Sequence, residues 1–287
     1  MLFTEAIEKF KDYLTKKDYA EKTIYNYSKI LEVFNQHLEK KYNGQVYLTD
    51  VVTEDIEDYI YQRKLEGDSS STRTLNGYTM RSFYKFIARK DFGKNITLDY
   101  EPPKAKIKER EYLTAEEMER VLAEIEKPLI RIVALFIFNT AARISEALDL
   151  KIDEISFEND LIKIIDGKNS KDRTIPLNST LKRELKYYFA NIRPKNIDSD
   201  FVFATAKSGS LSSAYFNRRL KKAVAKAGIN KSISAHCLRH SCAVFLTTQQ
   251  DVALPTIQRI LGHENLQTTS VYLHADPSQM RDALEAM

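Results

Sequence analysis

Residues 128–150 read PLIRIVALFIFNTAARISEALDL and form the most apolar segment of the chain. This segment is apolar on almost every side, which predicts a central helix buried in a protein core. Arg143 lies near the end of the helix, where an unpaired charge is costly. Glu146 follows three residues later, so a local salt bridge is one explanation for Arg143 and a bound ligand is the other.

Short strands and further helices are expected around this segment. Thr114 and Glu117 form the capping-box pattern at the start of a helix that precedes it. After it, LIKIID and RTIPL are β-rich runs on either side of GKNSKD, which predicts a hairpin. Further helices are predicted at residues 179–192, 212–228, 235–249, 255–261 and 266–274. A short amphipathic tail begins at Pro277.

The first hundred residues have the pattern of a helical bundle. Two sets of apolar residues recur three or four positions apart, as on one face of a helix: Phe3, Ile7, Phe10 and Leu14, then Ile24, Tyr27, Leu31, Phe34 and Leu38. Thr53 is expected to cap a third helix that stops at Gly67. Residues 72–90 are expected to form a fourth helix, with Phe83, Phe86 and Ile87 facing inward.

The segment DYEPPKAKIKEREYLT has a Pro-Pro pair, many charges and no apolar period, which is typical of a linker. We therefore expect a helical domain over residues 1–100, a linker over 101–111 and a second domain over 112–287. The predicted fold class is mainly α with a small antiparallel β-sheet, divided between two domains.

The composition limits the class of protein. No apolar run reaches the roughly 20 residues that span a bilayer, and the N-terminal MLFTEAIEKFKDYL is charged and amphipathic, unlike a secretory signal. A soluble, cytoplasmic protein without a membrane partner is expected. The two cysteines, Cys237 and Cys242, would point about 140° apart on a helix. They cannot pair within one chain, which fits a reducing compartment.

The positive charge is unevenly distributed. Residues 1–100 contain 16 basic and 16 acidic residues, whereas residues 201–250 contain eight basic residues and no acidic one. A solvated basic face is one explanation, but binding to a polyanion is favoured. The candidate contacts are basic residues on the outer faces of two predicted helices: Arg81, Lys85 and Arg89, then Arg218, Arg219 and Lys222.

Residues 234–243, SAHCLRHSCA, bring polar side chains onto one helical face. His236, Arg239 and His240 share that face, while both cysteines leave it. A zinc site is the alternative, but it needs three or four converging ligands, and a guanidinium between two histidines would repel the ion. A guanidinium beside an imidazole suits an anion such as phosphate.

Further residues complete an ordered pattern. Lys168 lies in the turn GKNSKDR, His263 follows Leu261 and Gly262, and Tyr272 lies in QTTSVYLH. Gly262 is expected to end a helix in the left-handed conformation. Together with Arg143 and the HCLRHS segment, this order resembles the tyrosine recombinase (phage integrase) family. The length, without an additional N-terminal domain, is most similar to the Xer subgroup, including its archaeal members.

Two positions differ from the family pattern. Ala141 stands where the family usually has glycine, and alanine is the better residue within a helix, so little change is expected. Asn169 follows the lysine where glycine is frequent, but asparagine also tolerates positive φ. Lys171 is a nearby alternative to Lys168 as the catalytic lysine, and Lys168 is preferred because it follows Gly167.

The resemblance implies a helical core-binding domain and a catalytic domain that close on double-stranded DNA as a clamp. It assigns catalytic roles to six residues: Arg143, Lys168, His236, Arg239, His263 and Tyr272. Tyr272 would attack the scissile phosphate to give a 3′-phosphotyrosine. Glu146 would support Arg143, and His240 would pack or assist nearby. No metal, ATP or other cofactor is implied.

The resemblance also implies an assembly and a function. The C-terminal tail would dock on a neighbouring protomer, giving a tetramer on two DNA sites, and folding back onto its own subunit is the alternative. The expected function is site-specific recombination of the Xer type, in chromosome dimer resolution. The alternatives are an integrase or excisionase of a mobile element, a type IB topoisomerase-like relaxing enzyme, and a non-catalytic architectural DNA-binding protein.

Overall fold

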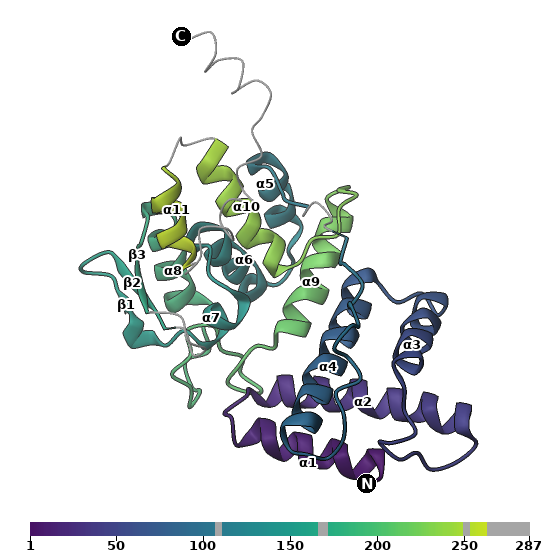
Figure 1. The fold of residues 1–287 in the computed structure, drawn as a ribbon. Helices are drawn as coiled ribbons and strands as arrows, with labels where there is room; N and C mark the ends of the chain where they lie inside the picture. The colour runs from purple at the N-terminus through teal and green to yellow at the C-terminus, as the bar shows by residue number, and fades with distance from the viewer. Residues whose placement is uncertain (107–110, 166–171, 249–252, 263–287) are drawn as a thin grey trace. The chain divides into compact units, whose positions relative to one another are not determined.

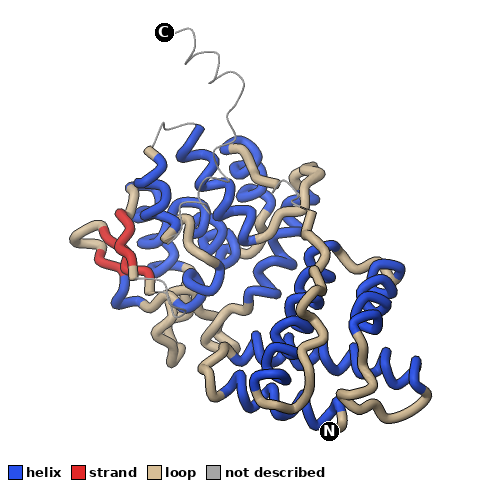
Figure 2. The backbone as a smooth tube through the Cα atoms, viewed as in Figure 1, coloured by secondary structure: helices blue, strands red, loops and turns tan. Residues whose placement is uncertain are grey.

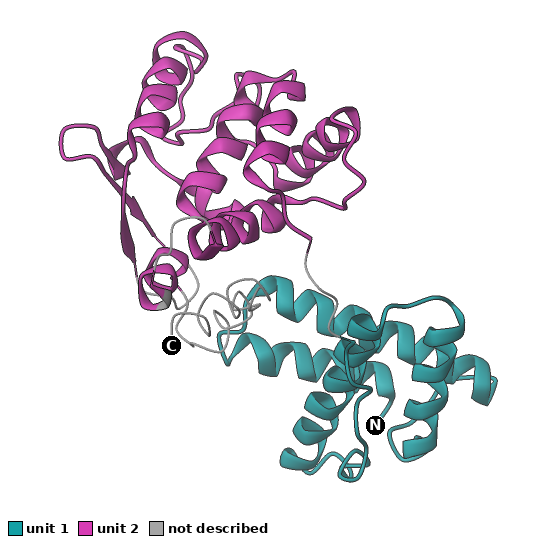
Figure 3. Cartoon of the chain, turned by 90° about the horizontal axis from the view of Figure 1, so that it is seen from above, with its two compact units in different colours: residues 1–108 teal, residues 109–287 magenta. Residues whose placement is uncertain are grey.

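The structure is a computed structural model that describes residues 1–106, 111–165, 172–248 and 253–262. The chain forms two compact units, residues 1–108 and residues 109–287 (Figure 3). The described part is mainly α-helical with one small antiparallel sheet, as predicted (Figure 2). Among the described helices, none is long and apolar enough to span a bilayer.

The described residues of unit 1 form four helices. They are α1 (Phe3–Thr15), α2 (Glu21–Tyr42), α3 (Thr53–Leu65) and α4 (Ser70–Arg89) (Figure 1). The stripe predicted for the first helix is wholly buried, and Leu31, Phe34 and Leu38 of the second lie in the same core. Phe83, Phe86 and Ile87 of α4 also lie in this core, as predicted. Burial of these stripes, rather than helix propensity alone, stabilises the unit.

The start of α3 differs from the prediction. The cap is Val52, whose backbone N–H donates to the Asp55 carboxylate at 2.9 Å. Thr53 is instead the first helical residue, and its hydroxyl donates to the carbonyl oxygen of Ile96 at 2.7 Å. Because the Thr53 hydroxyl makes this long-range hydrogen bond, it does not cap α3.

Residues that follow α4 return along that helix. The Thr74 hydroxyl donates to the carbonyl oxygen of Pro103 at 2.5 Å, and the Lys106 backbone N–H donates to the Ser70 hydroxyl at 3.0 Å. Gly77 allows this close approach, because a Cβ there would lie 2.8 Å from Cβ of Pro102. The first half of the predicted linker thus has ordered contacts with unit 1.

Unit 2 surrounds a buried helix, α6 (Pro128–Thr140), whose neighbours include α5, α8, α9 and α10. The other helical elements that the structure describes in this unit are α5 (Ala115–Glu124), α7 (Ile144–Asp149), η1 (Ile152–Glu154), α8 (Ser179–Asn191), α9 (Ser213–Lys226), α10 (Ala235–Thr248) and α11 (Leu254–Leu261). The predicted capping box of α5 is present, since Thr114 and Glu117 exchange side-chain to backbone hydrogen bonds of 2.9 and 3.2 Å.

A three-stranded sheet lies in the same unit, in the order β1 (Ile155–Ser156), β2 (Leu161–Ile164) and β3 (Arg173–Pro176). The antiparallel pairing expected of the predicted hairpin is confirmed, with Ile162 opposite Ile175 and Ile164 opposite Arg173. All three isoleucines are buried, so one face of the sheet joins the core. This pairing places Arg173 at the start of β3, near α7 and α11.

Candidate active site

The apolar segment 128–150 is two helices, which corrects the single helix expected from its sequence. α6 ends at Thr140, and Ala141 has φ 51° and ψ 25°, the left-handed conformation. Arg143 then caps α7 in an extended conformation. Contrary to expectation, Ala141 gains nothing from the helix propensity of alanine, because this residue ends the helix in a conformation where glycine is less strained.

Contacts on both sides hold this break in place. The Thr140 hydroxyl donates to the carbonyl oxygen of Phe136 at 2.7 Å and accepts from the backbone N–H of Ala142 at 3.3 Å. The carbonyl oxygen of Ala141 accepts a 2.7 Å hydrogen bond from Arg239. As a result, the backbone turns between two helices at the position from which Arg143 projects.

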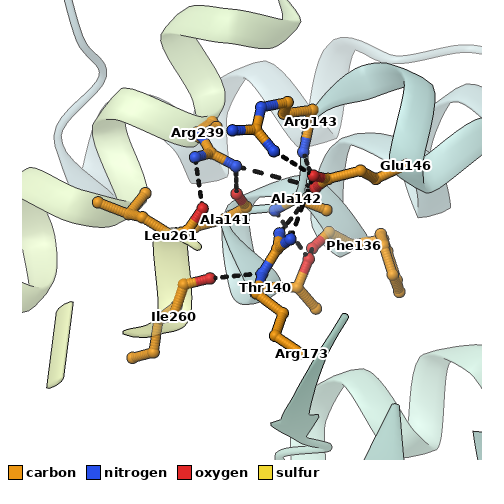
Figure 4. A network of polar contacts seen from close by, with 10 residues as sticks. All are labelled: Phe136, Thr140, Ala141, Ala142, Arg143, Glu146, Arg173, Arg239, Ile260 and Leu261. Atoms are coloured by element: carbon orange, nitrogen blue, oxygen red, sulfur yellow. Dashed lines mark hydrogen bonds and ion pairs between the residues drawn. The ribbon is translucent and has the colours of Figure 1, made fainter. Parts of the chain in front are cut away.

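Glu146 lies at the centre of three arginines, and we call these four side chains the arginine cluster (Figure 4). Its carboxylate accepts from the Arg143 guanidinium at 2.5 Å and from the Arg143 backbone N–H at 2.7 Å. It also accepts two bonds from Arg173, of 2.7 and 3.1 Å, and lies 3.8 Å from Nη1 of Arg239. The local salt bridge of Arg143 is thus present, within a larger network.

The electrostatics of Glu146 follow from these contacts. Burial raises the pKa of this carboxyl, but hydrogen bonds from Arg173 and Arg143, with the charge of Arg173, outweigh burial and lower the pKa to about 2. Glu146 is therefore ionised at neutral pH. Three guanidinium groups and one carboxylate leave these four side chains with a sum of two positive charges, which suits an anionic ligand.

Arg239 is 2% exposed and is the largest side chain among the fully buried residues. Nη1 donates to the carbonyl oxygen of Ala141 and Nη2 to that of Leu261, at 2.7 and 2.6 Å. These bonds offset the cost of burying a charge. They also join α10 to the ends of α6 and α11, so Arg143 and Arg239 reach one carboxylate from segments far apart in sequence.

Arg173 was not anticipated as a member of the site. The sequence RTIPL predicted only a strand, yet the side chain of Arg173 is 8% exposed and binds Glu146 with two nitrogens. The signal in the sequence was a charged residue at the start of a short β-rich run, five positions after Lys168. Its partners come from other segments, so spacing alone could not identify it.

The two histidines of α10 differ in burial. His236 is exposed in the first turn, where the Asn217 side chain accepts from the backbone N–H of Ala235 at 2.8 Å. His240 is 5% exposed and packs edge to face against the Tyr112 ring, with 5.9 Å between ring centroids. The polar face predicted for this helix therefore has an exposed end and a buried end.

Three predicted catalytic residues, Lys168, His263 and Tyr272, lie outside the described residues, as do Lys171 and the tail from Pro277. The nearest described neighbour of His263 is Gly262, which ends α11 with φ 64°, as expected for a left-handed cap. The roles of these residues stay predictions.

Unit 1 carries a polar groove of about 440 Å³ beside α4. The predicted DNA contacts Arg81, Lys85 and Arg89 line this groove with the aromatic rings of Tyr13 and Tyr78. All three basic residues are exposed, and Arg89 donates to the Tyr13 hydroxyl at 3.1 Å. Cations and aromatic rings are thus combined on one surface, a combination that suits nucleic acid.

Unit 2 has a second basic surface on α9. The guanidinium groups of Arg218 and Arg219 lie 5.2 and 5.1 Å from the ring centroid of Tyr215. Lys222 is exposed one turn further along the helix. These contacts orient the two arginines.

The cysteines of α10 are both free thiols. Cys242 is 4% exposed, and burial raises its pKa to about 12. Within the described ranges, no three His, Cys, Asp or Glu side chains come close enough to hold a metal ion.

Comparison with known proteins identifies the family. Residues 111–279 match the model of the phage integrase family, and residues 7–91 match that of the phage integrase N-terminal SAM-like domain. The chain therefore belongs to the phage integrase family. Within it, the chain is a Xer-like site-specific tyrosine recombinase.

The relatives cover nearly the whole chain. The tyrosine recombinase XerC of Caldanaerobacter subterraneus subsp. tengcongensis is 31% identical, over 97% of this chain and 85% of the relative. XerA of Pyrococcus furiosus is 29% identical, over 99% of this chain and 94% of its own. Among solved structures, a lambda integrase tetramer bound to a Holliday junction has the same fold, with a TM-score of 0.77 at 18% identity, covering 92% and 78% of the two chains.

Proposed function

We propose that this protein cuts and rejoins double-stranded DNA at a specific site through a 3′-phosphotyrosine on Tyr272. The observation that carries the proposal is the arginine cluster, in which Arg143 and Arg239 approach the same carboxylate. Two guanidinium groups in one place can bind the nonbridging oxygens of a single phosphodiester. The family membership of the chain supports the same chemistry.

In the proposed reaction, the Tyr272 oxygen attacks the scissile phosphorus as the phenol loses its proton, and the bond to the 5′ oxygen breaks. Arg143 and Arg239 offset the charge that develops on the phosphate oxygens. Lys168 gives a proton to the departing 5′ oxygen, and His236 acts as acid or base near the nucleophile. His263 binds the phosphate or orients its neighbours. Religation reverses these steps.

The two arginines differ in burial. The Arg143 side chain is 37% exposed, whereas Arg239 is 2% exposed and also donates to the carbonyl oxygens of Ala141 and Leu261. Glu146 keeps both cations in place at neutral pH because its own pKa is low. His240 supports the site by packing against Tyr112.

The two basic surfaces supply the remaining DNA contacts. We expect Arg81, Lys85 and Arg89 of unit 1 to bind phosphates, and the same of Arg218, Arg219 and Lys222 on α9. In this proposal the two units close on the duplex as a clamp in the cytoplasm. The presence of both family domains in one chain supports a clamp.

We also propose that four copies assemble on two DNA sites through the C-terminal tail. Support comes from the fold shared with lambda integrase, which has been solved as a tetramer on a Holliday junction. Deletion of residues 277–287 should abolish synapsis of two sites while single-site binding persists. If the tail instead folds onto its own subunit, the deletion variant will still pair two sites.

The proposed biological role is chromosome dimer resolution, in line with the Xer-like relatives. Mapping the bound sequence across a genome tests this role. One chromosomal site favours resolution, whereas a site at the boundary of a mobile element favours integration or excision. Recombination between two sites separates either enzyme from a topoisomerase-like one, which would only relax supercoils.

A nicked suicide duplex that carries the mapped sequence tests the chemistry. The wild-type protein should form a covalent DNA adduct, and Tyr272→Phe should form none. Tyr187→Phe, which removes a hydroxyl from a tyrosine that is 59% exposed on α8, serves as the matched control and should form the adduct normally. Absence of an adduct in the wild-type protein would leave a non-catalytic DNA-binding function.

A further inference from the structure

Arg173 makes three hydrogen bonds with one guanidinium group (Figure 4). Nη2 and Nη1 donate to the two carboxylate oxygens of Glu146 at 2.7 and 3.1 Å, and Nε donates to the carbonyl oxygen of Ile260 at 2.9 Å. The side chain is 8% exposed. All three of these donors bind protein oxygens, which indicates a role inside the site.

Arg173 and its two partners belong to three segments that carry proposed catalytic residues. β3 begins at Arg173, directly after the segment that contains Lys168. Glu146 lies in the first turn of α7, which Arg143 caps. Ile260 precedes the LGH sequence that ends at His263.

The turn at the end of α11 is packed against Arg173. Gly262 has φ 64°, and a Cβ added there would lie 3.1 Å from both Cδ and Nη1 of Arg173. A side chain at position 262 would therefore press on the guanidinium as well as strain the backbone. Because Gly262 has no side chain, the turn can pack directly against Arg173.

Arg173 also fixes the position of the Glu146 carboxylate. Its two parallel bonds form the bidentate arrangement that binds a carboxylate strongly. The same carboxylate accepts from Arg143 and lies 3.8 Å from Arg239. Arg173 therefore fixes the position of the group against which the other two arginines are placed.

We propose that Arg173 is a positioning residue of the recombination reaction, which holds Glu146 and the end of α11 so that Arg143 and Arg239 can bind the scissile phosphate. This inference rests on the proposed function. It assigns to Arg173 no contact with DNA. Arg173 acts only through the geometry of the arginine cluster.

The test uses Arg173→Lys, which keeps the charge but cannot form the bidentate pair and the third bond together. On the suicide duplex, we expect the cleavage rate constant to fall about 10- to 100-fold, because small displacements of catalytic groups cost this much. The dissociation constant for DNA should stay within about threefold. Arg131→Lys is the matched control and should cleave normally, since Arg131 is 43% exposed and pairs with Glu184 at 3.0 Å.

A second substrate separates positioning from a general loss of structure. A methylphosphonate at the scissile position removes a negatively charged oxygen, so correct placement of the cations matters less. The defect of Arg173→Lys relative to wild type should shrink to about threefold or less on this substrate, because the defect acts through charge stabilisation. A destabilised fold would lower both rates by the same factor.

Three results would overturn the inference while the proposed function stands: wild-type cleavage by Arg173→Lys, an equal defect on both substrates, or a loss confined to DNA affinity. If the wild-type protein forms no adduct, the proposed function fails and this inference fails with it. The wild-type measurement therefore distinguishes the two failures.

Discussion

Arg239 donates a 2.7 Å hydrogen bond to the carbonyl oxygen of Ala141, which lies 98 residues earlier in the chain. The acceptor belongs to the residue whose left-handed conformation ends α6. The break in the apolar segment and the buried arginine therefore stabilise each other. Their hydrogen bond connects Arg239 to the turn that precedes Arg143, and the geometry of this turn can be tested by substitution at position 141.

Ala141→Gly is expected to change the free energy of unfolding by less than about 1 kcal/mol. Relief of left-handed strain, about 1 kcal/mol, offsets the loss of a buried methyl group, also about 1 kcal/mol. Ala141→Val should destabilise by more than about 2 kcal/mol, because a β-branched residue resists positive φ and the site is fully buried. Urea denaturation measures both changes, and equal stability of the two variants would argue against the left-handed conformation.

Glu146 should make stability depend on pH. Its pKa is about 2 in the folded protein, below the ordinary value of 4.5, so the carboxylate contributes stability above pH 4.5 that is lost as the pH falls toward 2. The full contribution is about 3 kcal/mol, of which about 2 kcal/mol is lost between pH 6 and pH 3. The stability difference between wild type and Glu146→Gln should therefore shrink by about 2 kcal/mol across this range. A constant difference in urea unfolding would refute this.

The groove beside α4 should determine the salt dependence of DNA binding. The logarithm of the association constant falls linearly with the logarithm of the salt concentration, and each phosphate contact contributes about 0.9 to the steepness of this slope. Replacing Arg81, Lys85 and Arg89 with glutamine should therefore make the slope shallower by about 2 to 3. The control variant carries glutamine at Lys16, Lys17 and Lys64, which are exposed in the same unit and do not line the groove. Fluorescence anisotropy at several salt concentrations gives both slopes. Equal slopes for the two triple variants would contradict a role of this groove in DNA binding.

The two thiols should react differently. Cys242 is buried and its pKa is raised to about 12, so it holds almost no reactive thiolate at pH 7.5. A thiol reagent should modify one cysteine in the native protein and two after unfolding. Cys237→Ser should leave the native protein unreactive, and rapid modification of two native thiols would contradict the burial of Cys242.

Much of the fold could be predicted because local patterns determine it. The stripe from Phe3 to Leu14, the capping box at Thr114 and the glycine cap at Gly262 each depend on residues within one or two turns. The hairpin followed from two β-rich runs around a turn. Strand β1 is only two residues long, too short to leave a period in the sequence.

The parts that were missed depend on contacts between distant segments. The bonds of Thr140 at the end of α6 leave no recognisable sequence pattern, and Arg239 holds the next carbonyl from another helix. Arg173 finds its partners 27 and 87 residues away, so its role could not be inferred from RTIPL alone. Thr53 likewise bonds to Ile96 instead of capping α3. In each case a tertiary hydrogen bond overrode a local expectation.

The most direct measurement is the cleavage rate constant of a suicide duplex with Arg143→Ala, Arg239→Ala and the double variant. If both arginines bind one phosphate, each single variant should lose at least about 100-fold in rate. The double variant should lose much less than the product of the two single losses. Cleavage at the wild-type rate by either folded single variant, or losses that multiply fully, would contradict a shared phosphate site.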